Sequence, residues 1–418
     1  MYFIPGYVSH YEEDGAIFVT SELYKNTVKL TDPQIMDEFH AIVRNGGCAD
    51  VSTELTHFLH EQELLVNEQE AKNALDELQG VLNNSLLVTI MPTEGCNFRC
   101  PYCYESHEPI AMRRKTLDHI CAYITKQADK FKNINISWFG GEPTLCKDMV
   151  LETAEVLQSL QKQYGIHYTS SMTTNGYLLN LENFLLYYNA GITSYQITLD
   201  GWNHDKTRPH VTGQGTLQTI IDNLSAISAL PQDEYKFHIT LRYNILPDSD
   251  CESWYDHLYR MFGHDSRFSV LVRPVGDWGG ETVDSLNLLT DNNAETVMRK
   301  HVDYLRKIGM LCENQKKSPL SQVCYASYPH SMVFRAGGLI EKCTVCLDHP
   351  KNRIGFVDDE QGVLIDAEAN RQWSGATLKS SCYHCANVTS CLNMQCRNAS
   401  LIGGIERCNR EDSLLDVF

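Results

Sequence analysis

Three cysteines stand close together at Cys96, Cys100 and Cys103, with the spacing CxxxCxxC. Three thiolates on one tight loop can each bind one iron of a four-iron, four-sulfur (4Fe-4S) cluster, because soft sulfur ligands suit such clusters. The fourth iron would then lack a protein ligand and stay open to a substrate or cofactor. Zinc is the alternative, but a closed tetrahedral zinc site needs a fourth ligand, and His107 is the only candidate nearby. The spacing therefore favours a 4Fe-4S cluster.

Most of the other cysteines gather near the C-terminus. The chain has 16 cysteines, nine of them from Cys312 to Cys408, and a CxxC pair stands at Cys382 and Cys385. In a reducing compartment, clustered thiols are more often metal ligands than disulfides. Zinc sites and iron–sulfur clusters suit this segment about equally when it is taken alone. The isolated cysteines are interpreted as small buried hydrophobes: Cys48, Cys121, Cys146 and Cys251.

The stretch from about residue 85 to 280 must position the first cysteines, and it alternates between strand-like and helix-like patterns. The predicted strands are Leu86–Met91, Ile134–Phe139, Tyr168–Thr174, Ser194–Leu199, Phe237–Tyr243 and Phe268–Val272. The predicted helices lie near 115–130, 148–163, 181–189, 216–229 and 252–262. Repeated βα units form a parallel sheet, and six strands are too few for a closed eight-stranded barrel. The expected fold class is α/β, with an open, partial (β/α)6 barrel.

Glycines and polar residues end several of these strands, at the edge where parallel α/β folds bind ligands. Two adjacent glycines after the second strand would let the backbone approach a ligand closely. The Arg242 guanidinium could grip a carboxylate through two parallel hydrogen bonds. Ordinary turns, and a structural salt bridge at Arg242, are the alternatives. The residues at these positions include Gly140, Gly141 and Glu142 after the second predicted strand, Thr174 and Asn175 after the third, Thr198 and Asp200 after the fourth, and Arg242 in the fifth.

The composition indicates a soluble, globular protein of two or three domains. Of 418 residues, 43% are hydrophobic and 21% are charged, and no apolar run approaches the roughly 18 residues of a membrane span. No Lys or Arg precedes Lys25, so we expect no secretory signal, no membrane partner and a cytoplasmic location. The 35 basic and 53 acidic residues give a formal charge of −18, which disfavours a nucleic-acid partner.

Residues 1–84 carry 15 acidic and four basic side chains, so most of the net negative charge lies in this segment. Ile17–Val19 and Thr27–Leu30 are expected to pair as strands, and Leu64–Val66 to form another. Apolar residues at helical spacing between these strands predict two helices, from about residue 35 and from about residue 54. This order of elements suits a small winged-helix-like module.

Four domains are expected in the chain. A bridging region would separate the barrel from the cysteine-rich segment, whose periodicity is weak. We expect that segment to bury little and to depend on metal for its fold. The expected domains are residues 1–84, 85–280, 281–311 and 312–418.

The stretch CNFRCPYCY, from Cys96 to Tyr104, resembles the signature of the radical S-adenosylmethionine (SAM) superfamily. In that family the open iron chelates SAM, and electron transfer from the cluster releases a 5′-deoxyadenosyl radical that abstracts a hydrogen atom. The resemblance implies that Tyr102 lies near the adenine and that Gly140, Gly141 and Glu142 meet the SAM ammonium group. Its ribose and carboxylate contacts would fall at Thr174, Asn175, Thr198, Asp200 and Arg242. A further stretch resembles the HDxxR element of peptide-modifying members, with a solvated loop as the alternative: His204, Asp205 and Arg208.

The C-terminal segment resembles the SPASM extension, which holds two auxiliary 4Fe-4S clusters in peptide-modifying enzymes. The resemblance implies three 4Fe-4S clusters in all. The fourth ligand of the first auxiliary cluster would be Cys312 or Cys346, or its iron would stay open. The spacing from Cys391 to Cys396 is one residue longer than is typical of the family. The implied ligands are Cys324, Cys343 and Cys396 for one cluster, and Cys382, Cys385, Cys391 and Cys408 for the other.

Residues 1–84 resemble the winged-helix element that captures the leader of a ribosomally made precursor peptide, and an acidic cap on the barrel is the alternative. Together the resemblances imply a radical SAM/SPASM peptide maturase, an oxidoreductase that forms an intramolecular crosslink. A thioether is preferred over a carbon–carbon bond, and a flavodoxin or ferredoxin would supply electrons. The alternatives are a maturase that forms formylglycine on sulfatases and a non-catalytic iron–sulfur or zinc protein.

Overall fold

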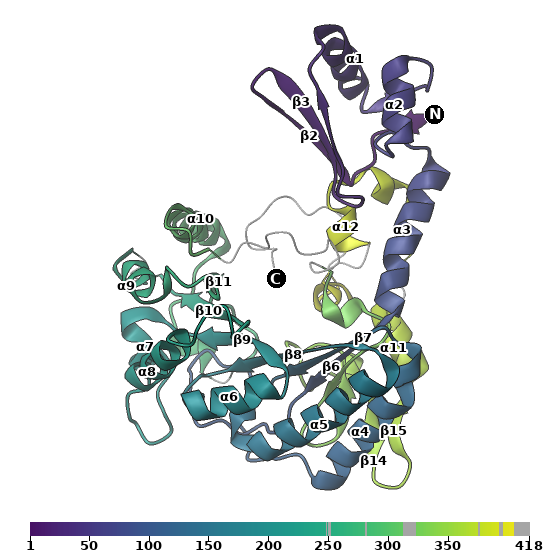
Figure 1. Cartoon of the computed structure of the whole chain (residues 1–418). Helices are drawn as coiled ribbons and strands as arrows, with labels where there is room; N and C mark the ends of the chain where they lie inside the picture. The colour runs from purple at the N-terminus through teal and green to yellow at the C-terminus, as the bar shows by residue number, and fades with distance from the viewer. Residues whose placement is uncertain are drawn as a thin grey trace.

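The computed structural model describes residues 1–247, 249, 252–280, 282–311, 323–374, 377–392 and 396–404 (Figure 1). Its centre is a sheet in which six parallel strands, β6 to β11, lie side by side in chain order. They are β6 (Ser85–Ile90), β7 (Asn133–Trp138), β8 (His167–Thr174), β9 (Ile192–Thr198), β10 (His238–Ile245) and β11 (Phe268–Pro274). Each strand begins and ends within two residues of its predicted bounds, so the predicted parallel sheet is confirmed.

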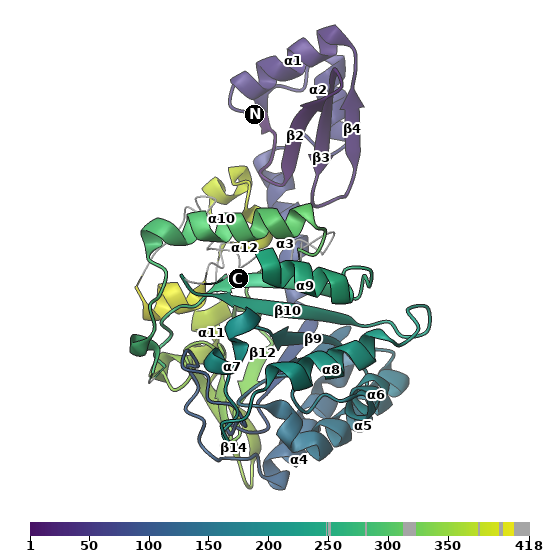
Figure 2. The same ribbon diagram turned by 90° about the vertical axis from the view of Figure 1, so that its left-hand side faces the viewer.

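Helices follow the strands and pack along the sheet (Figures 1 and 2). The five predicted helices are confirmed, and a long helix, α10, occupies the region expected only to bridge two domains. In the part of the chain that is described, no helix is long and apolar enough to cross a membrane. The helices that follow the parallel strands are α4 (Arg114–Gln127), α5 (Lys147–Tyr164), α6 (Leu181–Asn189), α7 (His204–Thr207), α8 (Leu217–Ser228), α9 (Glu252–Phe262) and α10 (Asp291–Lys307).

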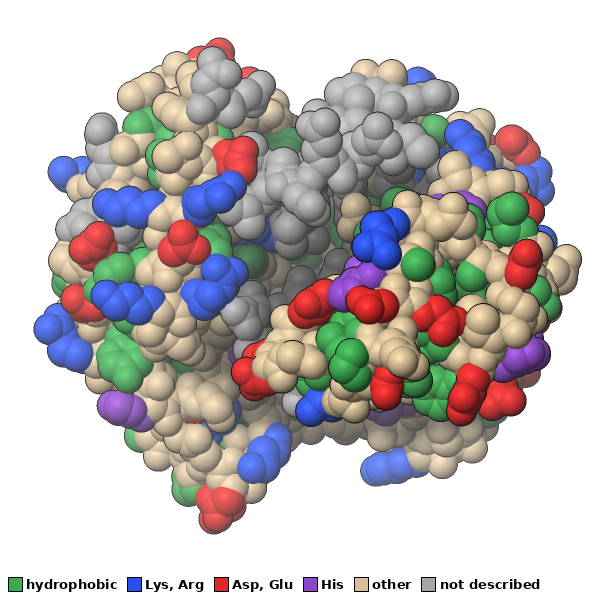
Figure 3. Space-filling model, turned by 90° about the horizontal axis from the view of Figure 1, so that it is seen from above, with side chains coloured by type: hydrophobic (Ala, Val, Ile, Leu, Met, Phe, Trp, Pro, Cys, Tyr) green, Lys and Arg blue, Asp and Glu red, His purple; other side chains and the backbone are tan. Residues whose placement is uncertain are grey.

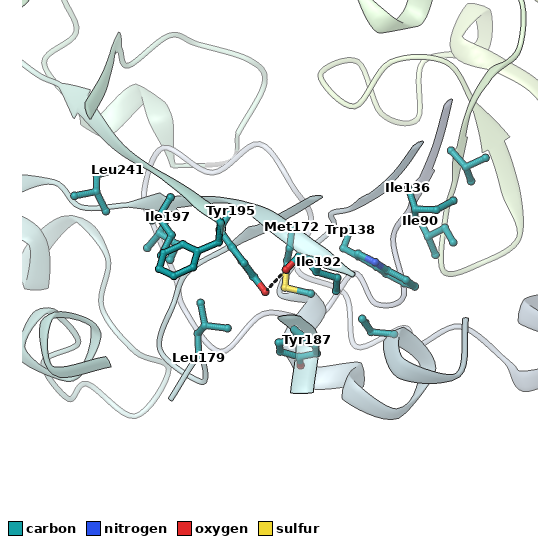
Figure 4. Packing of buried hydrophobic residues seen from close by; sticks show 14 of the residues in the cluster. Ile90, Ile136, Trp138, Met172, Leu179, Tyr187, Ile192, Tyr195, Ile197 and Leu241 are labelled. Atoms are coloured by element: carbon teal, nitrogen blue, oxygen red, sulfur yellow. Dashed lines mark hydrogen bonds between the residues drawn. The ribbon is translucent and has the colours of Figure 1, made fainter. Parts of the chain in front are cut away.

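Apolar side chains of the strands and helices meet in one large core (Figure 4). Trp138, Met172 and Tyr195 are almost fully buried there. The Tyr195 hydroxyl donates a hydrogen bond of 2.9 Å to the Ile192 carbonyl, so its polar atom is satisfied inside the core. Each fully buried large apolar side chain contributes roughly 1.5–3 kcal/mol, so this core holds the strand ends in fixed positions.

The C-terminal segment continues the central sheet instead of standing apart from it. β12 pairs in parallel with β6, placing Ser331 opposite Leu87, and three antiparallel strands extend the sheet to ten. Phe334 and Ile340 are fully buried. The expectation that this segment buries little was therefore wrong, because its first strands cover the open edge of β6. The elements are β12 (Ser331–Phe334), β13 (Leu339–Glu341), β14 (Arg353–Asp358), β15 (Gly362–Ile365), α11 (Ala367–Ser374) and α12 (Val388–Cys391).

Residues 1–84, here called the N-terminal module, form a three-stranded antiparallel sheet with three helices. The predicted pairing of the strands near residues 17 and 28 is confirmed. The predicted strand at Leu64–Val66 was wrong, because these buried residues make only one bridge, from Val66 to Phe3. The elements are β1 (Tyr2–Phe3), β2 (Val8–Glu13), β3 (Ala16–Ser21), β4 (Thr27–Leu30), α1 (Pro33–Arg44), β5 (Cys48–Ala49), α2 (Glu54–Glu61) and α3 (Glu68–Asn83).

The N-terminal module is joined to the rest of the chain in two ways. Helix α3, which begins with a capping box at Asn67, runs from the module down to the barrel (Figure 1). The module also shares its apolar core with Tyr383, Val388 and Leu392 of the C-terminal segment. Seen from above, acidic side chains outnumber basic ones on the module surface that faces the reader (Figure 3). The N-terminal module and the segment from Tyr383 to Leu392 therefore fold against each other.

A buried cluster of charges ties the C-terminal strands to the loop after β6. The Arg335 guanidinium donates to both carboxylate oxygens of Glu94, at 2.9 and 2.5 Å, and to Glu341 at 3.3 Å. Arg335 is 4% exposed and Glu94 is 7% exposed. A charge buried this deeply is strongly destabilising when its partner is removed, because it has lost its contact with water.

Arg335→Met should destabilise the fold by about 3–5 kcal/mol, since it leaves Glu94 and Glu341 buried without their cation. Denaturant unfolding monitored by circular dichroism measures the change. Arg371→Met is the matched control, because Arg371 pairs with Glu368 on an exposed helix surface. Equal stability of the two variants would contradict this account.

Candidate functional site

Residues 93–103, here called the cysteine loop, follow β6 and dock against the turn after β7. The Gly141 N–H donates to the Thr93 carbonyl at 3.1 Å, and the Glu142 N–H donates to the Gly95 carbonyl at 3.0 Å. Gly140 has a φ of +101°. A Cβ on Gly140 or Gly141 would lie under 3.0 Å from backbone oxygens of the loop. Both glycines are therefore needed for contact between two segments of the protein, whatever ligand they also meet.

The other side of the cysteine loop is fastened to the segment after α7. The Arg99 N–H donates to the Pro209 carbonyl and the Val211 N–H donates to the Asn97 carbonyl, both at 2.9 Å. Phe98 lies fully buried between these bonds. The loop is thus fixed from two sides by contacts within the protein.

The three thiols of the loop lie in partly buried surroundings. Burial raises the pKa of Cys96 and of Cys103 to about 12, with nearby Glu142 and Glu105 adding to the effect. Burial also raises the pKa of Cys100, against the opposing charge of Arg208. The thiols are therefore protonated at neutral pH in the absence of metal. Because metals bind thiolates, any metal bound by these thiols would displace their protons.

The arrangement of potential ligands bears on which metal group fits. Across the described ranges, no three His, Cys, Asp or Glu side chains converge closely enough to hold one metal ion. A zinc ion needs four such ligands at about 2.0–2.3 Å from a single point. The thiolates of a 4Fe-4S cluster bind different irons and lie farther apart. Three thiols on one loop are a donor set that would suit three irons of a 4Fe-4S cluster.

Glu142 joins the ends of β7 and β8. Its carboxylate is 0% exposed and accepts hydrogen bonds from the hydroxyls of Thr144 and Thr174, both at 2.6 Å. It also accepts from the backbone N–H groups of Thr144 and Asn175, at 3.0 and 2.7 Å. Burial raises its pKa, while these donors act in the opposite direction. Glu142 thus has a structural task, and contact with SAM stays a prediction.

Asn175 carries the connection from β8 to the cysteine loop. Its side-chain N–H donates to Oδ1 of Asn97 at 2.7 Å and lies 4.0 Å from the Cys96 sulfur. Its own Oδ1 accepts from the Tyr177 N–H at 3.0 Å. The structure therefore brings Glu142, after β7, and Asn175, after β8, together, and Asn175 lies beside Cys96.

Tyr102 connects the cysteine loop to the end of β9. Its hydroxyl donates to Oδ2 of Asp200 at 2.5 Å and accepts from the Arg208 guanidinium at 3.0 Å. That guanidinium lies 5.6 Å from the Phe98 ring centroid. Burial alone would lower the pKa of Arg208, but Cys100, Tyr102 and Asp200 together raise it, so the side chain stays charged. A positive charge is thus held beside the loop that carries the cysteines.

The other residues predicted after β9 have separate positions. The His204 Nδ1 accepts from the Asp200 N–H at 3.1 Å, and burial lowers the pKa of His204 to about 3. Asp205 caps α8 by accepting from the Thr216 and Leu217 N–H groups at 2.7 and 2.8 Å. His204 and Arg208 therefore adjoin the site, whereas Asp205 holds a neighbouring helix.

Thr198 and Arg242 lie opposite each other on β9 and β10. Thr198 is buried, and the Arg242 Nε donates to the Asn244 side chain at 2.9 Å. The Arg242 charge lowers the pKa of Tyr104 against the larger effect of burial, which places this guanidinium near the cysteine loop. Thr198 ends β9, whereas Arg242 lies three residues before the end of β10.

Two groups at the site were not foreseen from the sequence. The Oδ1 atom of Asn97 accepts a hydrogen bond from the Asn175 side chain. Glu105 is partly buried, and its Oε2 atom has no hydrogen-bond partner among the described residues. Burial raises the pKa of Glu105 to about 8, with Arg335 opposing the rise. The short spacing of Glu105 from the cysteines was the only available signal in the sequence.

The structure gathers the cysteines of the first implied auxiliary site. Burial raises the pKa of Cys324 to about 12, and Cys343 and Cys396 raise it further. The neighbouring Cys346 side chain lowers the pKa of the Cys343 thiol. Of the two candidates for a fourth ligand, Cys346 therefore lies beside this group, while Cys312 falls outside the described residues.

The cysteines of the second implied site lie under the N-terminal module. The Cys385 N–H donates to the Cys382 carbonyl at 3.1 Å, and the Gly6 N–H donates to the Tyr383 carbonyl between them at 2.7 Å. Cys391 ends α12, which packs against the same turn. Cys408 lies outside the described residues.

Residues 90–257 match the family described as the Radical SAM superfamily. The chain is also similar to two GTP 3′,8-cyclases. It is 31% identical to the Haemophilus ducreyi enzyme over 36% of this chain and 42% of that enzyme. It is 30% identical to a Stenotrophomonas maltophilia enzyme over 43% of this chain and 51% of that enzyme. The chain thus spans about half or less of the length of these relatives.

Two solved structures share the fold. Native anSMEcpe with bound AdoMet and Cp18Cys peptide has a TM-score of 0.54 and 18% identity, covering 73% of this chain and 88% of that chain. Streptococcus suis SuiB bound to precursor peptide SuiA has a TM-score of 0.51 and 13% identity, covering 94% of each chain. The chain therefore carries a radical SAM domain with an α/β fold, and the family match supports binding of SAM.

Gly141→Ala should destabilise the protein by about 1–3 kcal/mol and lower its iron content, because the new Cβ pushes against the backbone of the cysteine loop. Gly80→Ala is the control, since its Cβ meets nothing within 4 Å and lies in α3, where Ala should add about 0.5–1 kcal/mol. Unfolding midpoints and iron assays after anaerobic reconstitution test both variants. Unchanged stability and iron in Gly141→Ala would show that the two segments are not tightly docked.

Proposed function

We propose, on the premise that residues 90–257 form a radical SAM domain, that this protein forms an intramolecular crosslink in a ribosomally made precursor peptide. The observation that carries the proposal is the cysteine loop at the carboxyl edge of the parallel sheet, fixed to the ends of β7, β8 and β9. Ligands bind at this edge in parallel α/β folds.

Cys96, Cys100 and Cys103 would hold a 4Fe-4S cluster, and the neighbouring strand ends would hold SAM. When bound, the cluster and SAM would supply the radical chemistry for abstracting hydrogen from a carbon of the substrate. The residues proposed to contact SAM are Tyr102, Gly140, Gly141, Glu142, Thr174, Asn175, Thr198, Asp200 and Arg242.

The chain's own residues prepare this site. The Gly140–Gly141 turn and the Glu142 network fix the cysteine loop, so no ordering of the loop is needed when ligands bind. The Arg208 charge lies beside Cys100 and offsets part of the negative charge that three thiolates bring to the loop. The charge of Arg242 would be available for a carboxylate.

A peptide substrate is supported by the extent of the structural likeness. The likeness to SuiB bound to precursor peptide SuiA extends over 94% of this chain, whereas the likeness to anSMEcpe extends over 73%. We infer that the N-terminal module, a small sheet with packed helices in a winged-helix-like arrangement, binds the leader of the precursor. The acidic surface of the module would favour a basic leader.

The C-terminal segment would hold two auxiliary 4Fe-4S clusters. The grouping of Cys324, Cys343 and Cys396, with Cys346 alongside, supports the first. Cys382, Cys385 and Cys391, together with Cys408, would hold the second. These clusters would accept the surplus electron of ring closure, and a flavodoxin or ferredoxin would reduce the SAM cluster. A thioether is the preferred product, with a carbon–carbon bond as the alternative.

Formylglycine formation is a second candidate function, because the anSMEcpe structure with its Cp18Cys peptide shares the barrel fold. A GTP 3′,8-cyclase activity is suggested by the sequence relatives, but the similarity covers at most 43% of this chain in the two enzymes compared. These functions predict different substrates for one site.

Anaerobic incubation with SAM, dithionite and a short peptide encoded beside the gene tests the proposed function. We expect the peptide to lose two hydrogens per crosslink while 5′-deoxyadenosine forms, and tandem mass spectrometry would locate the new bond. Parallel assays use GTP and a cysteine peptide of the sulfatase type. Conversion of either one, with no change in any encoded peptide, would refute the crosslinking proposal and leave the radical chemistry intact.

Changing any one of Cys96, Cys100 and Cys103 to Ala should abolish formation of 5′-deoxyadenosine, because the SAM cluster loses a ligand. Iron content should fall from about 12 to about 8 atoms per chain if three 4Fe-4S clusters are present. Cys121→Ala is the control, since Cys121 is a partly buried thiol on α4, away from the cysteine loop. Colorimetric iron assays and chromatographic detection of deoxyadenosine report the two effects. Retained cleavage of SAM in all three variants would refute the assignment.

A further inference from the structure

A pocket of about 410 Å³ opens in the N-terminal module, where none of the residues assigned to SAM or to a cluster lies. Tyr7 and Tyr24, which flank the β2–β3 hairpin, form one wall. The end of α2 and the first turns of α3 form the other. The pocket therefore lies between the small sheet and the helix that leads to the barrel.

The walls of this pocket are acidic. Four carboxylates line it, and none of its lining residues is a Lys or Arg. The Glu70 carboxylate already has partners within the protein: it hydrogen-bonds to His60 at 3.1 Å and accepts from the Asn67 N–H at 2.9 Å. The remaining three make no hydrogen bond or ion pair with another described residue: Glu61, Glu63 and Glu77.

Tyr7 provides an independent sign of a missing partner. Its side chain is 1% exposed, it lines the pocket, and its hydroxyl has no hydrogen-bond partner among the described residues. A buried hydroxyl without a partner is unfavourable and is usually satisfied by another group. Burial raises the pKa of Tyr7, and Tyr24, Glu63 and Glu70 raise it further, which places the hydroxyl in the field of the carboxylates.

The pocket also has an apolar part, formed by Val66 and Ala74, which are both buried. A ligand that suits these walls has an aliphatic stem and a cationic head able to donate hydrogen bonds. Lys and Arg side chains have this form. A bare metal ion fits less well, because no three carboxylates in the described residues converge on one point.

We propose that this pocket binds a Lys or Arg side chain of the peptide that the enzyme modifies. The stem would lie along Val66 and Ala74, and the cation would lie among Glu63, Glu77 and the Tyr7 hydroxyl. This inference rests on the proposed peptide substrate and adds the chemical class of residue by which the N-terminal module selects it. The net negative charge of residues 1–84 would also draw such a peptide toward the pocket.

Steady-state kinetics with the full chain and the precursor peptide encoded beside the gene test the proposal. For the Glu63→Gln/Glu77→Gln variant we expect KM for this peptide to rise by roughly tenfold. For the wild-type protein we expect a similar rise when the critical Lys or Arg of the peptide is replaced by Gln. The two changes should not add when combined, because both remove the same ion pair.

The matched control is Glu13→Gln/Asp37→Asn, which removes the same charge from exposed positions on β2 and α1. It should leave KM within about twofold of wild type, since distant exposed charges are screened. Tyr7→Phe should raise KM without lowering the melting temperature, because the lost hydroxyl has no partner within the described protein. An equal rise in KM for both double variants would overturn the pocket in favour of general electrostatic steering.

Failure of the pocket proposal can be distinguished from failure of the proposed function. If the wild-type protein modifies the peptide and KM is unchanged in Glu63→Gln/Glu77→Gln and in Tyr7→Phe, the pocket proposal alone is wrong. If the wild-type protein modifies no encoded peptide while it still forms 5′-deoxyadenosine, the proposed function fails and the pocket proposal fails with it.

Discussion

The docking of the Gly140–Gly141 turn onto the cysteine loop is the constraint on which the rest of the site depends. Backbone groups of the two segments bond directly, and the space for even one methyl group is absent at either glycine. This close approach brings Glu142 to the end of β8 and leads on to Asn175 and Cys96. The cysteine loop is therefore positioned by protein contacts that reach across three strands.

Electrostatics complete this arrangement from the opposite side. Glu94, at the start of the cysteine loop, is held by Arg335 of the C-terminal segment, and the same arginine contacts Glu341. Arg208 supplies a second positive charge near Cys100. Burying these charges is costly unless each has its partner, so the barrel and its extension depend on each other.

The sequence predicted the six parallel strands and their helices well, because buried strands and amphipathic helices alternate there with clear periodicity. Glu142, Asn175 and Asp200, at three of the strand ends, do lie beside the cysteine loop. Prediction failed for the C-terminal segment, where Phe334 and Ile340 are buried only because β12 pairs with β6, far away in the chain. The Leu64–Val66 run is apolar because it lies in a core, and apolarity alone does not distinguish a strand from a buried turn. Likewise, no local pattern could reveal that Arg335 is the partner of Glu94.

The shared core of the N-terminal module and the segment from Tyr383 to Leu392 has a consequence for how such enzymes diversify. A recombination event that exchanged only the first 84 residues would leave an apolar face on Val388 and Leu392 without its complement. The module would therefore accept point substitutions on its outer surface more readily than a wholesale exchange of residues 1–84. Inheritance of the module and the segment from Tyr383 to Leu392 as one unit follows from their packing.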